Sequence, residues 1–177
     1  LTHFHADFVS GQVDLANATG ATIVFGPTAK ADYEFHEATD GEIFELGNVN
    51  FKWLHTPGHT LESSTILLKD EAGNDHCIFT GDTLFIGDVG RPDLAVKQGT
   101  LTEKDLAELL FDSLRGKIMP LSDELTVYPG HGAGSACGKK MSKETFDTLG
   151  NQKANNYALR SDMSKVEFVE EVLTGLT

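Results

Sequence analysis

The sequence predicts an α+β fold in one domain, built as a layered sandwich. Short runs of β-branched and aromatic residues alternate with helix-like segments in pairs, rather than in strict strand–helix–strand order. The length of 177 residues suits a single domain with a real hydrophobic core. No internal repeat or low-complexity linker divides the chain. We therefore expect residues 1–177 to form one domain.

The first half of the chain predicts one short helix followed mainly by strands. Gly20 ends an amphipathic pattern as a helix stop signal, and Gly47-Asn48 separates two apolar runs as a hairpin turn does. The expected segments are a helix at 9–19, a strand at 21–25, a loop at 28–41, and a hairpin of strands 42–46 and 49–54.

The second half predicts further strands and then helices. Thr102 with Asp105, and Ser164 with Glu167, have the spacing of capping boxes, which predicts a helix start at each place. The expected segments are strands at 64–68 and 77–79, a long loop at 84–100, a helix at 106–114, a strand at 125–128, and helical segments from 142 and from 164.

Side chains suited to metal binding follow several of these strands. The opening residues Thr2 to Phe8 place two histidines at i and i+2 and an aspartate at i+4. Three later loops each carry a histidine or aspartate beside glycine, directly after an apolar run. The candidate ligands are His3, His5, Asp7, His59, Asp82 and His131. Imidazole and carboxylate together suit zinc or iron, whereas calcium and magnesium prefer mostly oxygen ligands.

These motifs, in this order, resemble the metallo-β-lactamase superfamily over nearly the whole chain. The run Gly81 to Leu94 is similar to the persulfide dioxygenase branch, whose bacterial members include forms fused to rhodanese domains. The resemblance implies an αβ/βα four-layer sandwich with the metal at one edge of the sheets. It also implies that strands and a helix precede the first motif, so we expect this chain to lack its N-terminal strands.

The main hypothesis implied by the resemblance is a mononuclear Fe(II), one per chain, held by His3, His59 and Asp82. Its open face would take a persulfide such as glutathione persulfide, which dioxygen oxidises to sulfite. The residues expected to support the ligands, or to remain from a second metal site, are His5, Asp7 and His131. Phe8 departs from the family signature, which ends in a histidine that binds the second metal of dinuclear members.

Two alternatives stay open. The first is a Zn(II) hydrolase of the glyoxalase II type acting on a thioester, in which a metal-bound hydroxide attacks the carbonyl carbon. Its first site would use His3, His5 and His59, and its second Asp7, His131 and a bridging Asp82; Phe8 argues against the second. The other alternative is a docking module for a rhodanese partner, with little activity of its own.

Four residues are candidates for substrate binding. Arg91 either holds a substrate carboxylate or forms a structural pair with Asp93 or Asp88. The other three, in the loop after His131 and in the C-terminal helical region, are Lys139, Tyr157 and Arg160. Their alternative is an ordinary surface or core role. Cys137 is interpreted as a surface-loop thiol.

Composition limits the partners. The formal net charge is −13 and the pI is near 4.8, which disfavours nucleic acid and anionic membrane surfaces. Two cysteines do not make a disulfide framework. No apolar run reaches the length of a transmembrane helix and no secretory signal is visible, so the expected location is the cytoplasm. A small thiol or persulfide is the expected partner, and a rhodanese domain or a homo-oligomer stays open.

Overall fold

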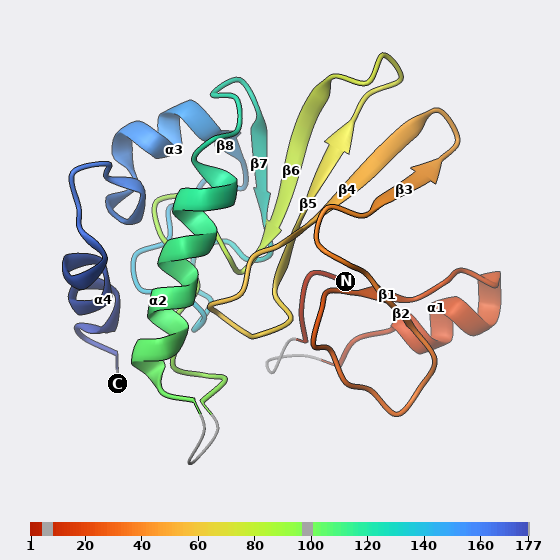
Figure 1. The fold of residues 1–177 in the computed structure, drawn as a ribbon, viewed down its shortest axis with the longest axis horizontal. Coiled ribbons are helices and arrows are strands. Elements are labelled where there is room, and N and C mark those ends of the chain that lie inside the picture. The colour runs from red at the N-terminus through yellow and green to blue at the C-terminus, as the bar shows by residue number, and fades with distance from the viewer. Residues whose placement is uncertain (5–8, 97–100, 177) are drawn as a thin grey trace.

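The computed structural model describes residues 1–4, 9–96 and 101–176, and its centre is a six-stranded mixed β-sheet (Figure 1). Neighbouring strands follow one another in chain order across this sheet. They are β3 (Ile43–Leu46), β4 (Val49–His55), β5 (Ser64–Lys69), β6 (Asp75–Gly81), β7 (Thr126–Pro129) and β8 (Asp147–Thr148). The α+β class expected from the sequence is confirmed.

Strand direction determines which loops meet. Strands β3 to β6 pair antiparallel in succession, β6 pairs parallel with β7, and β8 is antiparallel to β7. Strands β4, β6 and β7 therefore run in the same direction, and their carboxyl ends lie at one edge of the sheet. The loops that follow these three strands carry His59, Asp82 and His131.

Helices cover one face of the sheet and enclose the main core (Figure 1). Leu67, Ile78 and Val127 are register partners on β5, β6 and β7, and all three are buried in this core. The next row, which includes Phe79 and Tyr128, points to the other face and is partly exposed, as strand alternation requires. The covering segments are α2 (Glu103–Ser113), η1 (Leu114–Ile118), α3 (Leu149–Asn155), η2 (Tyr157–Leu159) and α4 (Lys165–Leu173).

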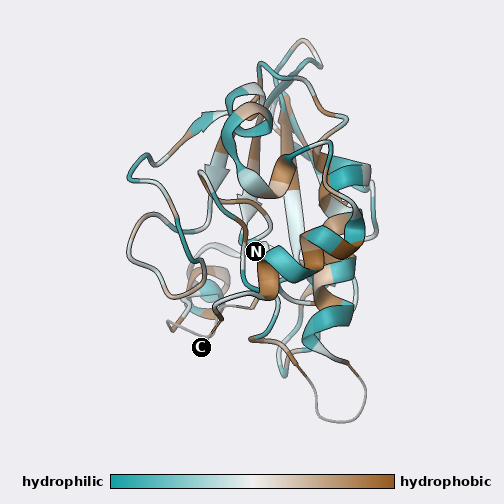
Figure 2. Ribbon diagram, turned by 90° about the vertical axis from the view of Figure 1, so that its left-hand side faces the viewer, coloured by the Kyte–Doolittle hydropathy of each residue, from teal (hydrophilic) through white to brown (hydrophobic). Residues whose placement is uncertain are grey.

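The two longest of these helices begin where the capping boxes predicted. The side chains of Thr102 and Ser164 accept from the N–H groups of Asp105 and Glu167, and both reciprocal bonds are present. Hydrophobic and hydrophilic segments alternate along the helical ribbons in Figure 2. Such helices place an apolar stripe on the sheet and leave charged residues in solvent.

A smaller unit precedes the main sheet. It contains α1 (Gln12–Thr19) and the two-residue strands β1 (Val24–Phe25) and β2 (His36–Glu37), which pair in parallel. Phe25 is fully buried and stacks on Phe4 with ring centroids 4.2 Å apart. This contact helps to fix the segment that carries His3.

Several element boundaries differ from those expected. The first helix begins at residue 12 instead of 9, and none of its residues is buried, so the amphipathic interpretation of 9–19 is wrong. The strand expected at 21–25 is confined to 24–25, and the loop expected at 28–41 contains β2. Each of these two-residue strands forms only because it pairs with the other. A π-helical turn extends α2, and the helix expected from 142 begins at 149 after β8. Among the described residues, no helix is long and apolar enough to cross a membrane.

Candidate metal centre

Four ligand-bearing segments converge at the edge of the sheet where β4, β6 and β7 end. His59 follows β4, Asp82 directly follows β6, and His131 lies two residues after β7. The first segment reaches the same edge because the Ser64 N–H, at the start of β5, donates to the Thr2 carbonyl at 2.9 Å. The topology thus brings His3 to residues that lie more than 50 positions later in the sequence.

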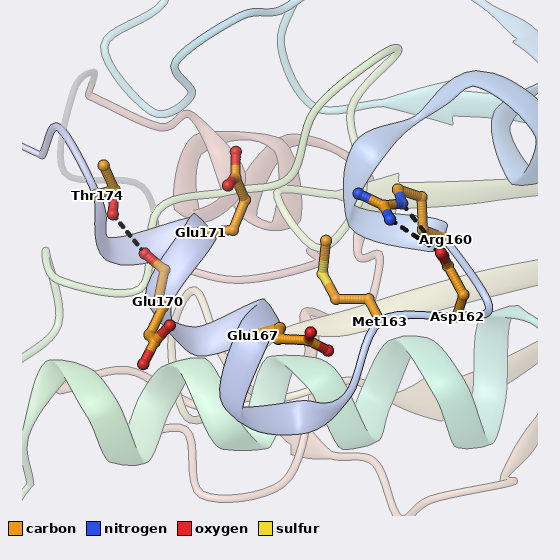
Figure 3. A pocket seen from close by; sticks show the side chains of 7 residues that line it. All are labelled: Arg160, Asp162, Met163, Glu167, Glu170, Glu171 and Thr174. Carbon is orange, nitrogen blue, oxygen red and sulfur yellow. Dashed lines mark hydrogen bonds and ion pairs between the residues drawn. The ribbon is translucent and has the colours of Figure 1, made fainter.

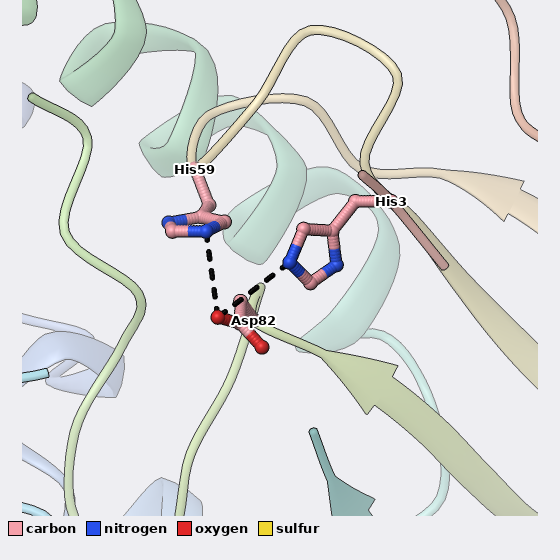
Figure 4. Close-up of side chains that lie close together, drawn as sticks. All are labelled: His3, His59 and Asp82. Carbon is pink, nitrogen blue, oxygen red and sulfur yellow. Dashed lines mark ion pairs between the residues drawn. The ribbon is translucent and has the colours of Figure 1, made fainter. Parts of the chain in front are cut away.

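The three histidines surround one carboxylate. Their Nε2 atoms lie 3.6 Å (His3), 3.4 Å (His59) and 3.3 Å (His131) from Asp82 Oδ2. Figure 4 shows the rings of His3 and His59 directed at Asp82 from separate segments. Exposure of these two histidines and of Asp82 is 1%, 4% and 1%, respectively, so they interact with little screening by water.

A hydrogen bond from the ring nitrogen that does not face Asp82 fixes the orientation of the His59 imidazole. Its Nδ1 lies 2.9 Å from the Arg91 carbonyl oxygen, which only accepts hydrogen bonds. We infer that Nδ1 carries the proton and that Nε2 presents its lone pair to Asp82. Two electron-pair donors then face each other at 3.4 Å. That arrangement is stable only with a cation or a proton between them.

The carboxylate of Asp82 is held as an anion without ordinary hydrogen bonds. Neither of its oxygens has a hydrogen-bond partner among the described residues. Burial would raise the pKa of Asp82, but His3, His59 and His131 outweigh it and hold that pKa below its usual range. Burial lowers the pKa of His59 and favours its neutral, ligating form. A buried carboxylate without donors is costly, which fits a metal ligand.

Two glycines leave room for the cluster. A Cβ at Gly90 would lie 2.0 Å from the Asp82 carbonyl oxygen and 3.1 Å from His59 Cγ. A Cβ at Gly130 would lie 2.5 Å from Asp82 Oδ1. Both loops therefore approach Asp82 more closely than any side chain allows.

Two overlapping donor sets of metal-binding size result. His3, His59 and Asp82 have ligand atoms within 4.8 Å of one another, and so do Asp82, His131 and Cys137. The interpretation of Cys137 as a surface-loop thiol is wrong, because this residue is 6% exposed. The spacing of residues in the sequence did not reveal that Cys137 is buried, because long-range contacts fold its loop onto the cluster.

Arg91 forms the structural pair that the sequence left open. Its Nε and Nη2 donate to the two oxygens of Asp93 at 2.8 and 2.6 Å, a bidentate geometry. Asp88 is not its partner. Instead, Asp88 accepts from the main-chain N–H groups of Lys139 and Lys140 and from the Tyr157 hydroxyl. Sequence reasoning did not assign this anchoring role to Asp88.

The side chains of Lys139 and Tyr157 both form hydrogen bonds to other parts of the protein. The Lys139 ammonium donates to the carbonyls of Glu171 and Thr174 near the end of α4. Burial, together with Asp88, raises the pKa of Tyr157 well above its usual range. Both residues line a cavity of about 100 Å³, which is smaller than typical ligand pockets of roughly 300–1,000 Å³.

Arg160 lies in a different hollow, shown in Figure 3. Its guanidinium pairs with Asp162 at 2.9 Å. Among the residues that the structure describes, three further carboxylates and no other cationic side chain line this hollow, which makes it unfavourable for an anionic substrate. Substrate binding by Arg91, Lys139, Tyr157 and Arg160 stays a prediction. His5 and Asp7 lie outside the described residues.

Comparisons with known proteins agree with this geometry. The family profile described as the metallo-beta-lactamase superfamily matches residues 1–131. A probable hydroxyacylglutathione hydrolase of Schizosaccharomyces pombe is 33% identical over 130 residues, or 73% of this chain and 46% of that protein. The mitochondrial persulfide dioxygenase ETHE1 of Bos taurus is 32% identical over 132 residues, which is 73% of this chain and 46% of that protein.

A solved metallo-beta-lactamase structure from Staphylococcus aureus superposes with a TM-score of 0.87 at 35% identity. The alignment covers 98% of this chain and 52% of that one. The chain thus spans about half the length of these similar proteins.

Proposed function

This chain belongs to the metallo-beta-lactamase superfamily, and within it we propose a metal-dependent persulfide dioxygenase that oxidises glutathione persulfide or a similar small persulfide. One observation carries the proposal: two buried imidazoles and one buried carboxylate converge as a compact group of three donors. Two histidines and one carboxylate on one face suit non-haem Fe(II), since the opposite positions stay available for dioxygen and substrate.

The proposed reaction converts RSSH, O2 and H2O into RSH, sulfite and two protons. The S–S bond breaks, the terminal sulfur is oxidised, and dioxygen is reduced. The four electrons that dioxygen gains come from the terminal sulfur; when bound, iron would supply the coordination positions and the one-electron chemistry that let dioxygen accept them. The residues that would hold it are His3, His59 and Asp82.

Residues of the protein itself orient the ligands and exclude water from the site. The Arg91 carbonyl fixes the tautomer and direction of His59, as partners of ligating histidines generally do. Burial of the cluster excludes bulk water from the ligand atoms. The adjacent Arg91–Asp93 pair stiffens the loop that carries this carbonyl. The similarity to the Bos taurus persulfide dioxygenase supports this choice of substrate.

A thioester hydrolase with Zn(II) is the second candidate. It is favoured by the position of His131, whose Nε2 lies as near to Asp82 Oδ2 as the other two imidazoles do. A third imidazole suits a zinc centre that activates water. The similarity to the hydroxyacylglutathione hydrolase of Schizosaccharomyces pombe supports this alternative.

The deciding experiment measures dioxygen uptake by anaerobically iron-reconstituted protein supplied with glutathione persulfide, with iron content assayed on the same sample. We expect uptake with one iron per chain, and its loss in His59→Ala and Asp82→Ala. Absence of uptake, together with zinc-dependent cleavage of a glutathione thioester, would replace the dioxygenase with the hydrolase.

A further inference from the structure

Three threonine hydroxyls lie in contact next to the loops that carry the metal ligands, and all three side chains are fully buried. Thr56 follows β4, Thr65 lies on β5, and Thr83 follows β6 and Asp82. The Thr56 hydroxyl lies 2.8 Å from the Thr83 hydroxyl and 3.2 Å from the Thr65 hydroxyl. The Thr83 hydroxyl also donates to the Thr56 carbonyl at 3.3 Å. Two contacts therefore join Thr56 to Thr83.

The Thr56–Thr83 pair connects the loop of His59 to the loop of Asp82. Thr83 is the residue after Asp82, and Thr56 is three residues before His59. Strand β5 lies between β4 and β6 in the sheet, so the ends of β4 and β6 are not joined by strand pairing. The two hydroxyls instead provide a direct link between the loops that follow these strands.

The residues between Thr56 and His59 are held against α2. The Ser113 hydroxyl donates to the Pro57 carbonyl at 2.7 Å. A Cβ at Gly58 would lie 2.4 Å from Leu110 Cβ, so the main chain of the loop touches the helix. Because this short segment has so little room to move, the position of Thr56 determines the position of His59.

The ligand atoms of the two loops repel each other when no cation or proton lies between them. The Nε2 lone pair of His59 faces the Asp82 carboxylate at 3.4 Å, and both side chains are buried, so water screens this repulsion little. A hydrogen bond between the loops opposes their separation. The Thr56 and Thr83 hydroxyls suit this role, since separating them would leave buried polar groups unpaired, which is costly.

We propose that Thr83 is a positioning residue for the metal centre and that its bond to Thr56 holds Asp82 and His59 at ligating distance before an ion binds. Support of this kind lowers the rearrangement that binding requires and so raises affinity. The role does not depend on which reaction the centre catalyses, and neither hydroxyl needs to touch the metal or the substrate.

The test measures Co²⁺ binding to the metal-free full chain through the visible absorption bands of cobalt, which change with coordination geometry. Thr83→Val replaces the hydroxyl with a methyl group of similar size. We expect this variant to bind Co²⁺ about 10–100-fold more weakly, the usual effect of losing a group that orients a ligand, and to show altered bands. Thr83→Ser keeps the hydroxyl and should restore both the affinity and the bands.

Thr65→Val is the matched control. It removes a fully buried hydroxyl from the same group of threonines but leaves the Thr56–Thr83 pair in place. It should lower stability while keeping the affinity and the bands of the wild-type protein. Equal losses of affinity in Thr65→Val and Thr83→Val, no loss in Thr83→Val, or no Co²⁺ binding by the wild-type protein would overturn the proposal. Dioxygen uptake is not measured, so failure of the proposed dioxygenase would not be mistaken for failure of this role.

A second measurement needs only the wild-type protein and decides the question if Thr83→Val folds poorly, which circular dichroism would show. In the metal-free protein, NMR should detect hydroxyl protons of Thr56 and Thr83 that exchange slowly with water, because the proposed bond exists without an ion. Rapid exchange in the metal-free protein that becomes slow only after Zn²⁺ is added would show that the metal organises the loops, and would overturn the proposal.

Discussion

The main-chain carbonyl of Arg91 accepts a hydrogen bond from His59 Nδ1 at 2.9 Å. The N–H of the same residue donates to the Cys137 carbonyl, also at 2.9 Å. One peptide segment therefore orients the His59 imidazole of the His3–His59–Asp82 donor set and anchors the loop that bears the Cys137 thiol of the other donor set. Displacement of this segment should affect both sets together, although Arg91 itself offers no metal ligand.

Gly90→Ala should disrupt this segment. The added Cβ would lie 2.0 Å from the Asp82 carbonyl oxygen, so backbone must move. Overpacking of this kind costs about 1–3 kcal/mol of stability, and metal affinity should fall because His59 is displaced. Gly116→Ala in η1 is the matched control, since a Cβ there meets nothing within 4 Å. Chemical denaturation and metal titration of both variants measure the effects, and equal behaviour would contradict the expectation.

Asp82→Asn should abolish stabilisation by metal. In the wild-type protein, an ion at about 100 times its Kd adds about 2.7 kcal/mol to the free energy of unfolding. For a domain of this size that corresponds to a rise in Tm of roughly 5–10 °C. The amide removes the charge that both donor sets share, so the Tm of the variant should not respond to metal. Persistence of most of the rise would show that the carboxylate is not a ligand.

Arg91→Lys separates positioning from substrate binding. Lysine keeps the charge but cannot form the bidentate pair with Asp93, and it leaves the main-chain bonds to His59 and Cys137 without that support. If Arg91 positions the loop, kcat should fall several-fold while KM changes little. Asp93→Asn, which weakens the same pair from its other side, should reproduce this pattern. A rise in KM alone for Arg91→Lys, absent from Asp93→Asn, would indicate contact with the substrate.

Local signals in the sequence predicted much of the fold. The hairpin of β3 and β4 follows from two apolar runs across Gly47-Asn48, and α2 and α4 begin at their capping boxes. The strand-exit positions of His59 and Asp82 follow from apolar runs that end at glycine-containing loops. These features depend on neighbouring residues, which a single sequence displays.

Other features depend on partners far along the chain. Strand β1 exists because it pairs with β2, twelve residues later, and two residues carry no periodicity of their own. Cys137 is buried because Arg91 and Asp88 hold its loop, 46 and 49 positions away in the sequence. The bonds of Tyr157 and Lys139 to Asp88 likewise arise from tertiary packing. A glycine-rich loop gives no sequence signal of such contacts.

The pH dependence of metal binding should follow the shifted pKa values of the ligands. Protons compete with metal for the same lone pairs, so affinity falls once a ligand becomes protonated. Burial lowers the pKa of His59 below the usual range for histidine, and the surrounding histidines hold the pKa of Asp82 below its usual range despite burial. Both residues are then deprotonated at neutral pH, and protons compete with the metal only below the pH at which an ordinary histidine titrates.

Cobalt titrations of the metal-free protein between about pH 8 and pH 5 measure this competition at the group formed by His3, His59 and Asp82. Affinity should be constant at the alkaline end and decline with increasing steepness at the acidic end. A tenfold loss of affinity per pH unit already between about pH 8 and pH 7 would mean that a ligand in this group is protonated at neutral pH. The inferred neutral His59, with its lone pair directed at Asp82, would then be wrong.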